Sequence, residues 1–168
     1  FLFNNFNLKG ILLKRPNIFI IAIAVAMPVM GMTIISPALS QIKSNLNISF
    51  SDTQLVLSMY FLSLAIGQLI SGPLSDKFGR RPIIILGSII YSFGAFSCLF
   101  MSDIKLLVIS RMIQGFGAAA CLSVGRTIIS DSYERSEAAE KMSTVTAVMV
   151  IIPILCFIFG GIFADLIG

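Results

Sequence analysis

Long stretches of the chain carry no charged side chain, and their length limits what the chain can fold into. Four such stretches lie between these pairs of charged residues: Arg15 and Lys43, Asp52 and Asp76, Arg81 and Asp103, Lys141 and Asp165. Roughly 20 helical residues cross a bilayer core, so each stretch is long enough to span it. A fifth stretch, residues 106–130, is interrupted by Arg111 and Arg126. Strands of a membrane barrel are shorter and alternate polar with apolar residues, so we predict an all-α membrane protein with about five transmembrane helices.

The composition supports this class. Hydrophobic residues make up 57% of the chain and charged residues only 12%, whereas soluble domains carry about 25% charged residues. The chain has a net charge of +4, but its cations lie between the apolar stretches and form no basic face, so the expected partner is the lipid bilayer and not nucleic acid. Histidine is absent and the three cysteines lie inside apolar stretches, so no metal site is expected and the cysteines are interpreted as free, buried thiols.

The distribution of Lys and Arg predicts the orientation of the chain. The expected spans cover residues 17–39, 53–73, 82–101, 104–130 and 142–165. Nine cations fall on one side of these spans and two on the other: Lys9, Lys14, Arg15, Lys77, Arg80, Arg81, Arg126, Arg135 and Lys141 against Lys43 and Lys105. Cytoplasmic loops of membrane proteins are enriched in Lys and Arg. We therefore expect a cytoplasmic N-terminus and a fifth span that ends on the external side.

Residues near the span boundaries have helix-capping character. Ser51 followed by Gln54 predicts a capping box at the start of the second span. The Gly72-Pro73 dipeptide predicts the end of that span, because proline removes a backbone donor. Ser102 or Asp103 is expected to cap the fourth span.

The segment SGPLSDKFGRRPII, residues 71–84, concentrates charge between the second and third spans. Taken by itself it is a short basic cytoplasmic loop in which Gly79 permits the left-handed backbone of a tight turn. Its order is more specific than that, because it resembles the G-x-L-x-D-x-x-G-R-[KR] loop between helices two and three of the major facilitator superfamily. The matching residues are Gly72, Leu74, Asp76, Gly79, Arg80 and Arg81.

This resemblance implies a role in gating. In the family the loop acts as a conformational latch, in which the aspartate, here Asp76, meets a helix of the other half of the transporter. The first arginine, here Arg80, pairs with acids that include one at the end of helix four, here Asp131. The resemblance also implies two halves of six helices each. Residues 1–168 would then form an incomplete N-terminal helical bundle, whose missing partner is the C-terminal half.

The fourth span contains RMIQGFGAAA, residues 111–120. A charged residue inside a span is costly, and one interpretation is that Arg111 extends to the external headgroups. The pattern R-x-x-Q-G-x-G-A-A, however, resembles the helix-four motif of proton-coupled members of the superfamily. That resemblance implies that Arg111, with Gln114 on the same face, lies in the proton and substrate pathway.

The fifth span partly resembles the helix-five antiporter motif of drug exporters. It keeps Pro153, Gly160 and Gly161, but Cys156 and Phe157 stand where the motif has its Gly-Pro pair. A proline kink and a glycine packing site in an ordinary membrane helix are the alternative interpretation.

The first span resembles that of the bicyclomycin/chloramphenicol-resistance (Bcr/CflA) branch, in which an aspartate often precedes the proline by four residues. Thr33 occupies that place here, four residues before Pro37. None of the five spans has a carboxylate near its middle, so proton coupling would use Arg111 indirectly or acids outside this chain.

Together these resemblances imply a transporter and not an enzyme, since no span pairs a nucleophile with a base. The expected function is that of the N-terminal portion of a proton-driven multidrug efflux transporter, which works by alternating access on small drug-like molecules. The proton gradient would supply the energy without a cofactor, and the location would be the bacterial inner membrane. Two alternatives remain open: an uptake symporter for a small metabolite, and a truncated membrane remnant that does not transport.

Overall fold

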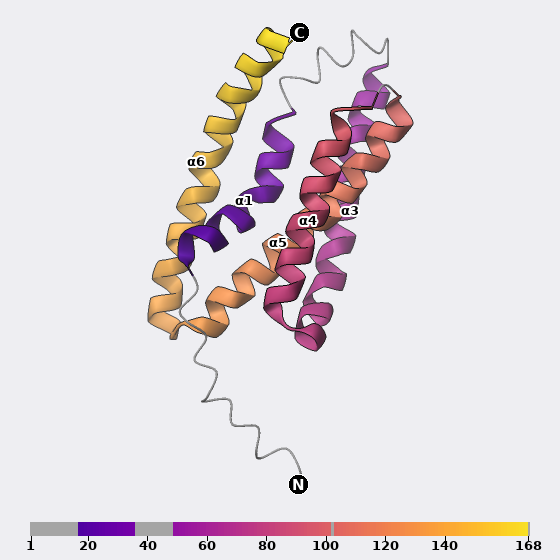
Figure 1. The fold of residues 1–168 in the computed structure, drawn as a ribbon. Helices are drawn as coiled ribbons and strands as arrows, with labels where there is room; N and C mark the ends of the chain where they lie inside the picture. Colours follow the sequence, from indigo (N-terminus) through magenta and orange to yellow (C-terminus); the bar gives the residue numbers. More distant parts are fainter. Residues whose placement is uncertain (1–16, 36–48, 102, 168) are drawn as a thin grey trace.

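The computed structural model describes residues 17–35, 49–101 and 103–167. These residues form helices and no strands, so the all-α prediction is confirmed for them. The helices are α1 (Ile18–Thr33), α3 (Phe50–Phe78), α4 (Arg80–Cys98), α5 (Ile104–Ser132) and α6 (Arg135–Ile167) (Figure 1). Four of them, α3 to α6, are long and apolar enough to cross a membrane, and α1 is a shorter apolar helix of 16 residues.

The N-terminus of α3 has a capping box, but at a different position from the predicted one. The Ser49 hydroxyl accepts a hydrogen bond from the Asp52 backbone N–H, and the Asp52 carboxylate accepts one from the Ser49 N–H at 3.1 Å. The predicted Ser51–Gln54 box is therefore wrong by two residues. A carboxylate suits this end better than the Gln54 amide, because the N-terminus of a helix carries partial positive charge.

The C-terminus of α3 also differs from the prediction. The helix continues through Gly72 and Pro73 and ends at Phe78, so the prediction that this dipeptide ends it is wrong. Membrane helices tolerate proline where side chains satisfy the freed backbone groups. In the same turn the Ser75 hydroxyl donates to the Gly72 carbonyl at 2.8 Å.

A single residue separates α3 from α4. Gly79 has φ 96° and ψ 152°, a region of backbone space that is essentially restricted to glycine. As predicted, this residue allows the chain to reverse at once, and α4 begins at Arg80.

The N-terminus of α5 is capped as predicted. Asp103 accepts a hydrogen bond from the Lys105 N–H at 3.0 Å, which confirms one of the two predicted caps. The other, Ser102, lies outside the described residues.

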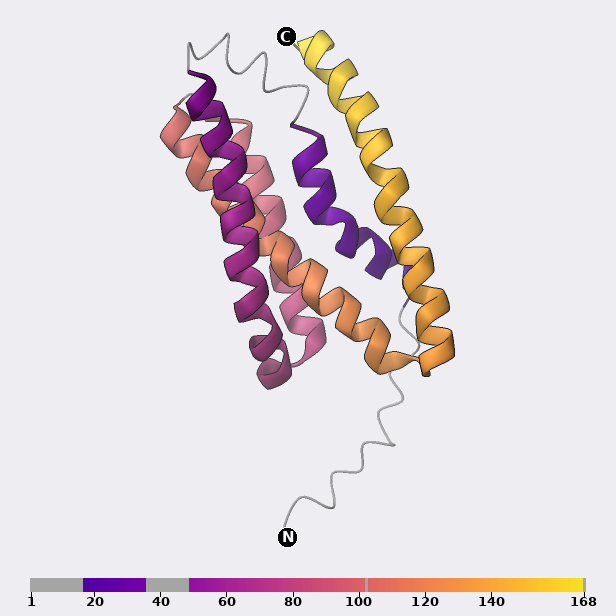
Figure 2. The ribbon, with the colours of Figure 1, turned by 180° about the vertical axis from the view of Figure 1, so that it is seen from behind.

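Helix α5 lies at the centre of the described bundle and packs against α1, α3 and α4. Small residues bring the backbones close together. A Cβ atom at Gly117 would overlap the backbone N of Tyr91 and the carbonyl O of Gly87 on α4. A Cβ at Gly67 on α3 would lie 2.7 Å from that of Ala119. The three helices α3, α4 and α5 therefore form a closely packed unit (Figures 1 and 2).

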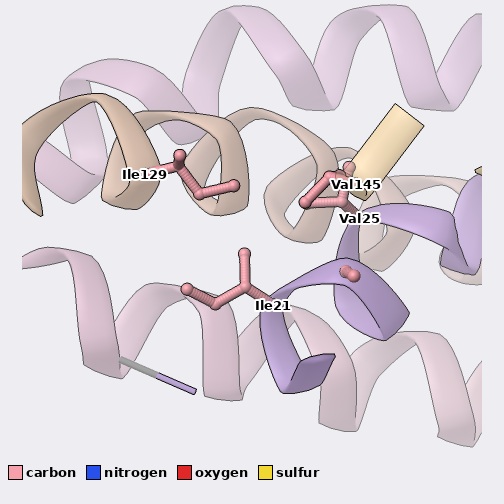
Figure 3. Close-up of a cluster of buried hydrophobic side chains, with 5 residues drawn as sticks. Ile21, Val25, Ile129 and Val145 are labelled. Carbon is pink, nitrogen blue, oxygen red and sulfur yellow. The ribbon is translucent and has the colours of Figure 1, made fainter. Parts of the chain in front are cut away.

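Helix α1 bends along its length (Figure 1) and contains Pro28, and internal proline is a common cause of such bends. It lies beside α6 in both views (Figures 1 and 2). Buried side chains from three helices meet here: Ile21, Ala22 and Val25 of α1, Ile129 of α5 and Val145 of α6 (Figure 3). This cluster attaches α6 to the rest of the bundle.

Large apolar side chains cover the outer surfaces of α3, α4 and α6. Leu69 is 78% exposed, Ile89 60% and Ile154 59%, and many neighbours are similar. Exposed apolar surface of this extent is typical of helices that face lipid or another membrane helix. The fold is therefore that of a membrane-spanning helical bundle.

Candidate functional site

Two groups of polar side chains are held by α5, one at its C-terminus and one in its N-terminal half. The first, the Arg80 cluster, consists of Ser75, Asp76, Arg80 and Asp131. Arg80 Nη1 lies 2.5 Å from Asp76 Oδ1 and donates to Ser75 Oγ at 2.5 Å. Its Nε donates to Asp131 Oδ2 at 3.2 Å. One guanidinium thus joins the end of α3, the start of α4 and the last turn of α5.

The local backbone explains this arrangement. Asp76 lies in the last turn of α3 and Arg80 is the first residue of α4. Because Gly79 reverses the chain between them, the two side chains meet at a spacing of four residues. Asp131 comes from a segment 51 positions later, so this contact depends on the packing of α4 against α5.

The ion pairs of the Arg80 cluster are partly exposed. The side chain of Arg80 is 30% exposed, that of Asp76 64% and that of Asp131 53%. Exposed pairs of this kind are worth about 0–1 kcal/mol. The contacts can therefore break and re-form at small cost, which suits a contact that differs between two conformations.

Two predicted members of the loop lie outside this cluster. Arg81 is exposed, and among the described residues it forms no ion pair. Gly72 lies in α3, and no described atom lies within 4 Å of a Cβ atom built on it. Within the described helices, packing does not require glycine at this position.

The second group, the Arg111 cluster, consists of Gly31, Tyr60, Arg111 and Gln114. Arg111 is only 5% exposed, so its side chain does not extend to the surface. Its Nη1 donates to the Gly31 carbonyl at 2.9 Å and to Gln114 Oε1 at 2.7 Å. Its guanidinium carbon lies 6.0 Å from the centre of the Tyr60 ring, within the range of a cation–π contact.

Arg111 meets α1 near its C-terminus. The last carbonyl groups of a helix lack intrahelical partners, and Gly31 lies in the last turn of α1. A cation at this end also complements the helix dipole. Tyr60 adds a second link, because its hydroxyl donates to the Pro28 carbonyl at 2.8 Å.

Glycine at position 31 makes this approach possible. A Cβ atom there would lie 2.8 Å from Tyr60 Oη, 3.2 Å from Tyr91 Oη and 3.3 Å from Gln114 Nε2. The hydroxyl and amide groups of three helices therefore crowd around the end of α1.

The charge of Arg111 is not balanced locally. Among the described residues no carboxylate forms an ion pair with it. Its Nε is buried and has no hydrogen-bond partner in the described part of the chain. An unpaired buried donor is costly, and because most buried polar groups in native proteins are hydrogen-bonded, this one is unusual.

The remaining predicted site residues are not brought into either cluster. Thr33 is half-buried, and its hydroxyl donates to the Val29 carbonyl of its own helix at 2.8 Å. Pro153 lies inside α6. No described atom lies within 4 Å of a Cβ built at Gly161, and the surroundings of Gly160 lie outside the described side chains.

Sequence reasoning missed Gly31, Tyr60 and Ser75. Tyr60 had a usable signal, because a phenol inside an uncharged span needs a hydrogen-bond partner. Ser75 lies five residues before Arg80, within reach once a tight turn is assumed. Gly31 gave no signal, since its partner is 80 positions away.

Comparison with known proteins defines the class. Residues 21–168 match the family model of the Major Facilitator Superfamily. The chain belongs to this superfamily of membrane transporters.

Individual members of the superfamily are similar to most of the chain. The chain is 32% identical over 153 residues to the bicyclomycin resistance protein homolog of Haemophilus influenzae, covering 88% of this chain and 38% of that protein. It is 29% identical over 145 residues to multidrug resistance protein D of Escherichia coli, covering 86% and 37%. An uncharacterized transporter of Rickettsia bellii is 33% identical over 129 residues, covering 77% and 32%. The chain thus spans about a third of the length of the curated relatives that it matches.

Proposed function

We propose that the chain is the N-terminal part of a drug exporter that works by alternating access in a bacterial inner membrane. The names of two relatives, a bicyclomycin resistance protein homolog and a multidrug resistance protein, support small drug-like molecules as substrates. The observation that carries the proposal is the Arg80 cluster, in which one guanidinium links three helices through partly exposed ion pairs.

In this proposal the Arg80 cluster is the gate. With Arg80 bound to Asp76 and Asp131, the ends of α3, α4 and α5 move as one body. Each pair is weak enough to be broken by a modest difference in the free energy of two conformations. Asp76 keeps most of its surface exposed, so it remains accessible to a helix of the second half.

The Arg111 cluster is proposed to couple transport to protons. The buried guanidinium has an unused donor and no local carboxylate, so its charge is stabilised poorly. A proton arriving at a neighbouring group, or a substrate entering, changes the free energy of this cluster strongly because the surroundings are apolar. The bond to Gly31 would pass that change to α1.

The second half is proposed to pack where the described helices leave small or apolar surface. Gly72 has open space around it, and glycine in a membrane helix allows close approach of another helix. The large apolar side chains of α6 are exposed on several sides, which fits contact with both lipid and a further helical unit.

The proposal is tested by expressing the full-length open reading frame that contains this chain in a drug-sensitive bacterium. We expect efflux of bicyclomycin or chloramphenicol that stops when a protonophore removes the proton gradient. Uptake of a metabolite together with protons would support the symporter alternative. A reading frame that ends at Gly168, with no transport, would support the remnant alternative.

A further inference from the structure

Tyr60 of α3 connects the last turns of α1 to α5 beside Arg111. Its side chain is only 2% exposed, and its hydroxyl donates to the Pro28 carbonyl of α1 at 2.8 Å. We infer that Tyr60 is a positioning residue for Arg111, because it holds α1 where the Gly31 carbonyl accepts the Arg111 hydrogen bond. The inference concerns the Arg111 cluster and rests on the proposed role of that cluster in transport.

The backbone of Tyr60 is fixed against α5. A Cβ atom at Gly115 would lie 2.5 Å from the Tyr60 carbonyl oxygen and would overlap Ser63 Oγ. The Ser63 hydroxyl donates to the same carbonyl at 2.9 Å. Gly115 follows Arg111 by four residues, so both lie on one face of α5. The close contact between α3 and α5 therefore sets the position of Tyr60 relative to Arg111.

Helix α1 is bound at two points that lie about one turn apart. The Pro28 carbonyl accepts from Tyr60 at 2.8 Å, and the Gly31 carbonyl accepts from Arg111 at 2.9 Å. Because proline lacks a backbone N–H, the helix also loses one internal hydrogen bond at Pro28. The end of α1 therefore depends more on its neighbours, and the bond from Tyr60 fixes the direction in which the Gly31 carbonyl points.

The side chain of Tyr60 also contacts both groups of the bond that it positions. Its ring centre lies 6.0 Å from the guanidinium carbon of Arg111, within the range of a cation–π contact. Its hydroxyl lies 2.8 Å from the position that a Cβ atom at Gly31 would occupy. A tyrosine that only fills a core needs one hydrogen-bond partner for its hydroxyl. Tyr60 has that partner and in addition borders the donor and the acceptor of a second bond.

Hydrogen exchange of the purified full-length protein tests the positioning directly. Tyr60→Phe keeps the ring and removes only the hydroxyl. The backbone amides in the last turn of α1 should then exchange about 2- to 12-fold faster, which is the range expected for the loss of one hydrogen bond. Tyr133→Phe is the matched control, because it makes the same change at the C-terminal end of α5, and it should leave exchange in this turn unchanged.

Efflux by the full-length protein separates positioning from general destabilisation. Tyr60→Phe should lower efflux per folded transporter by about 2- to 12-fold, and Tyr60→Leu should lower it further because the ring is also lost. In the Arg111→Lys protein, Tyr60→Phe should have little additional effect, since both changes act on one bond. In the Asp131→Asn protein it should lower efflux by the same factor as in the parent, because Asp131 lies about 30 Å from Arg111 along α5.

The two measurements distinguish this inference from the proposed function. Faster exchange at the end of α1, with an effect on efflux that disappears in the Arg111→Lys protein, supports the inference. Unchanged exchange in Tyr60→Phe overturns it, and so does an equal loss of efflux in both protein backgrounds, which would show that Tyr60 only stabilises the bundle. A parent protein that exports no drug overturns the proposed function, and the exchange measurement then decides by itself whether Tyr60 positions α1.

Discussion

Arg111 Nη1 donates a hydrogen bond of 2.9 Å to the backbone carbonyl of Gly31, which joins the N-terminal half of α5 to the last turn of α1. This bond gives Arg111 a structural contact in addition to its proposed place in the transport pathway. The same nitrogen also binds Gln114. A shift of the Arg111 guanidinium would therefore also change the hydrogen bond that Nη1 makes to α1.

Replacing Arg111 with Lys should reduce transport strongly while the protein still inserts into the membrane. Lysine keeps the positive charge but lacks the planar fork that contacts two acceptors. We expect efflux to fall at least 10-fold, measured against the amount of protein in the membrane. Arg135→Lys, which makes the same change at an exposed position, should have little effect. Full efflux in Arg111→Lys would exclude a role for the guanidinium geometry.

Asp131→Asn should separate gating from stability. The pair with Arg80 is 3.2 Å long and its partners are 30% and 53% exposed, so its loss should cost less than about 1 kcal/mol in the free energy of unfolding. Transport should fall severalfold, because the proposed gate then loses one of its contacts. Thermal unfolding in detergent measures the change in stability, and drug efflux from cells measures the change in transport. Unchanged efflux would contradict the gating role of this cluster.

Gly31→Ala should destabilise the bundle. The added methyl group would lie 2.8 Å from Tyr60 Oη, and overpacking of this kind costs about 1–3 kcal/mol. Gly161→Ala is the matched control, because no described atom lies within 4 Å of its Cβ position and alanine favours the helix by about 0.5–1 kcal/mol. The midpoint of thermal unfolding should fall for the first variant only. An equal midpoint for both would show that α1 does not approach Tyr60 this closely.

A cysteine placed at Lys77 tests the orientation. Lys77 is exposed in the last turn of α3, and the positive-inside rule places this end in the cytoplasm. We expect a membrane-impermeant thiol reagent to label Lys77→Cys only in inside-out vesicles or after cell lysis. The native Cys121 and Cys156 are buried and Cys98 is half-buried, so the parent protein should give a low background. Labelling in intact cells would reverse the predicted topology.

The sequence contained enough information for the helices and for the Arg80 cluster. Apolar stretches predict helices directly, and the loop motif predicts the pairing of Arg80 with Asp131 that the structure contains. The additional contact of Arg80 with Asp76 was not predicted, because the motif implies a partner for Asp76 in the other half of the transporter. The exact ends were less predictable. The N-terminal cap of α3 uses Ser49 and Asp52 instead of Ser51 and Gln54, because several polar residues in a row satisfy the same local rule.

The surroundings of Arg111 could not be predicted in the same way. Local rules allowed both an arginine that extends to the headgroups and one that is buried. The choice depends on Gly31, whose lack of a side chain leaves room for the guanidinium. Whether Arg111 is buried is therefore decided by the packing of a helix distant in sequence and not by the residues near Arg111.

The attachment of α1 also has a consequence for biosynthesis. During translation α1 leaves the ribosome before α3, α4 and α5, and Arg111 follows Gly31 by 80 positions. At 5–20 residues per second this is a delay of roughly 4–16 s. The helices α3, α4 and α5 follow one another with short joins and can assemble as they emerge. Helix α1 therefore waits in the bilayer before its main partners are made, and it can pack against α5 and α6 only after both have been synthesised.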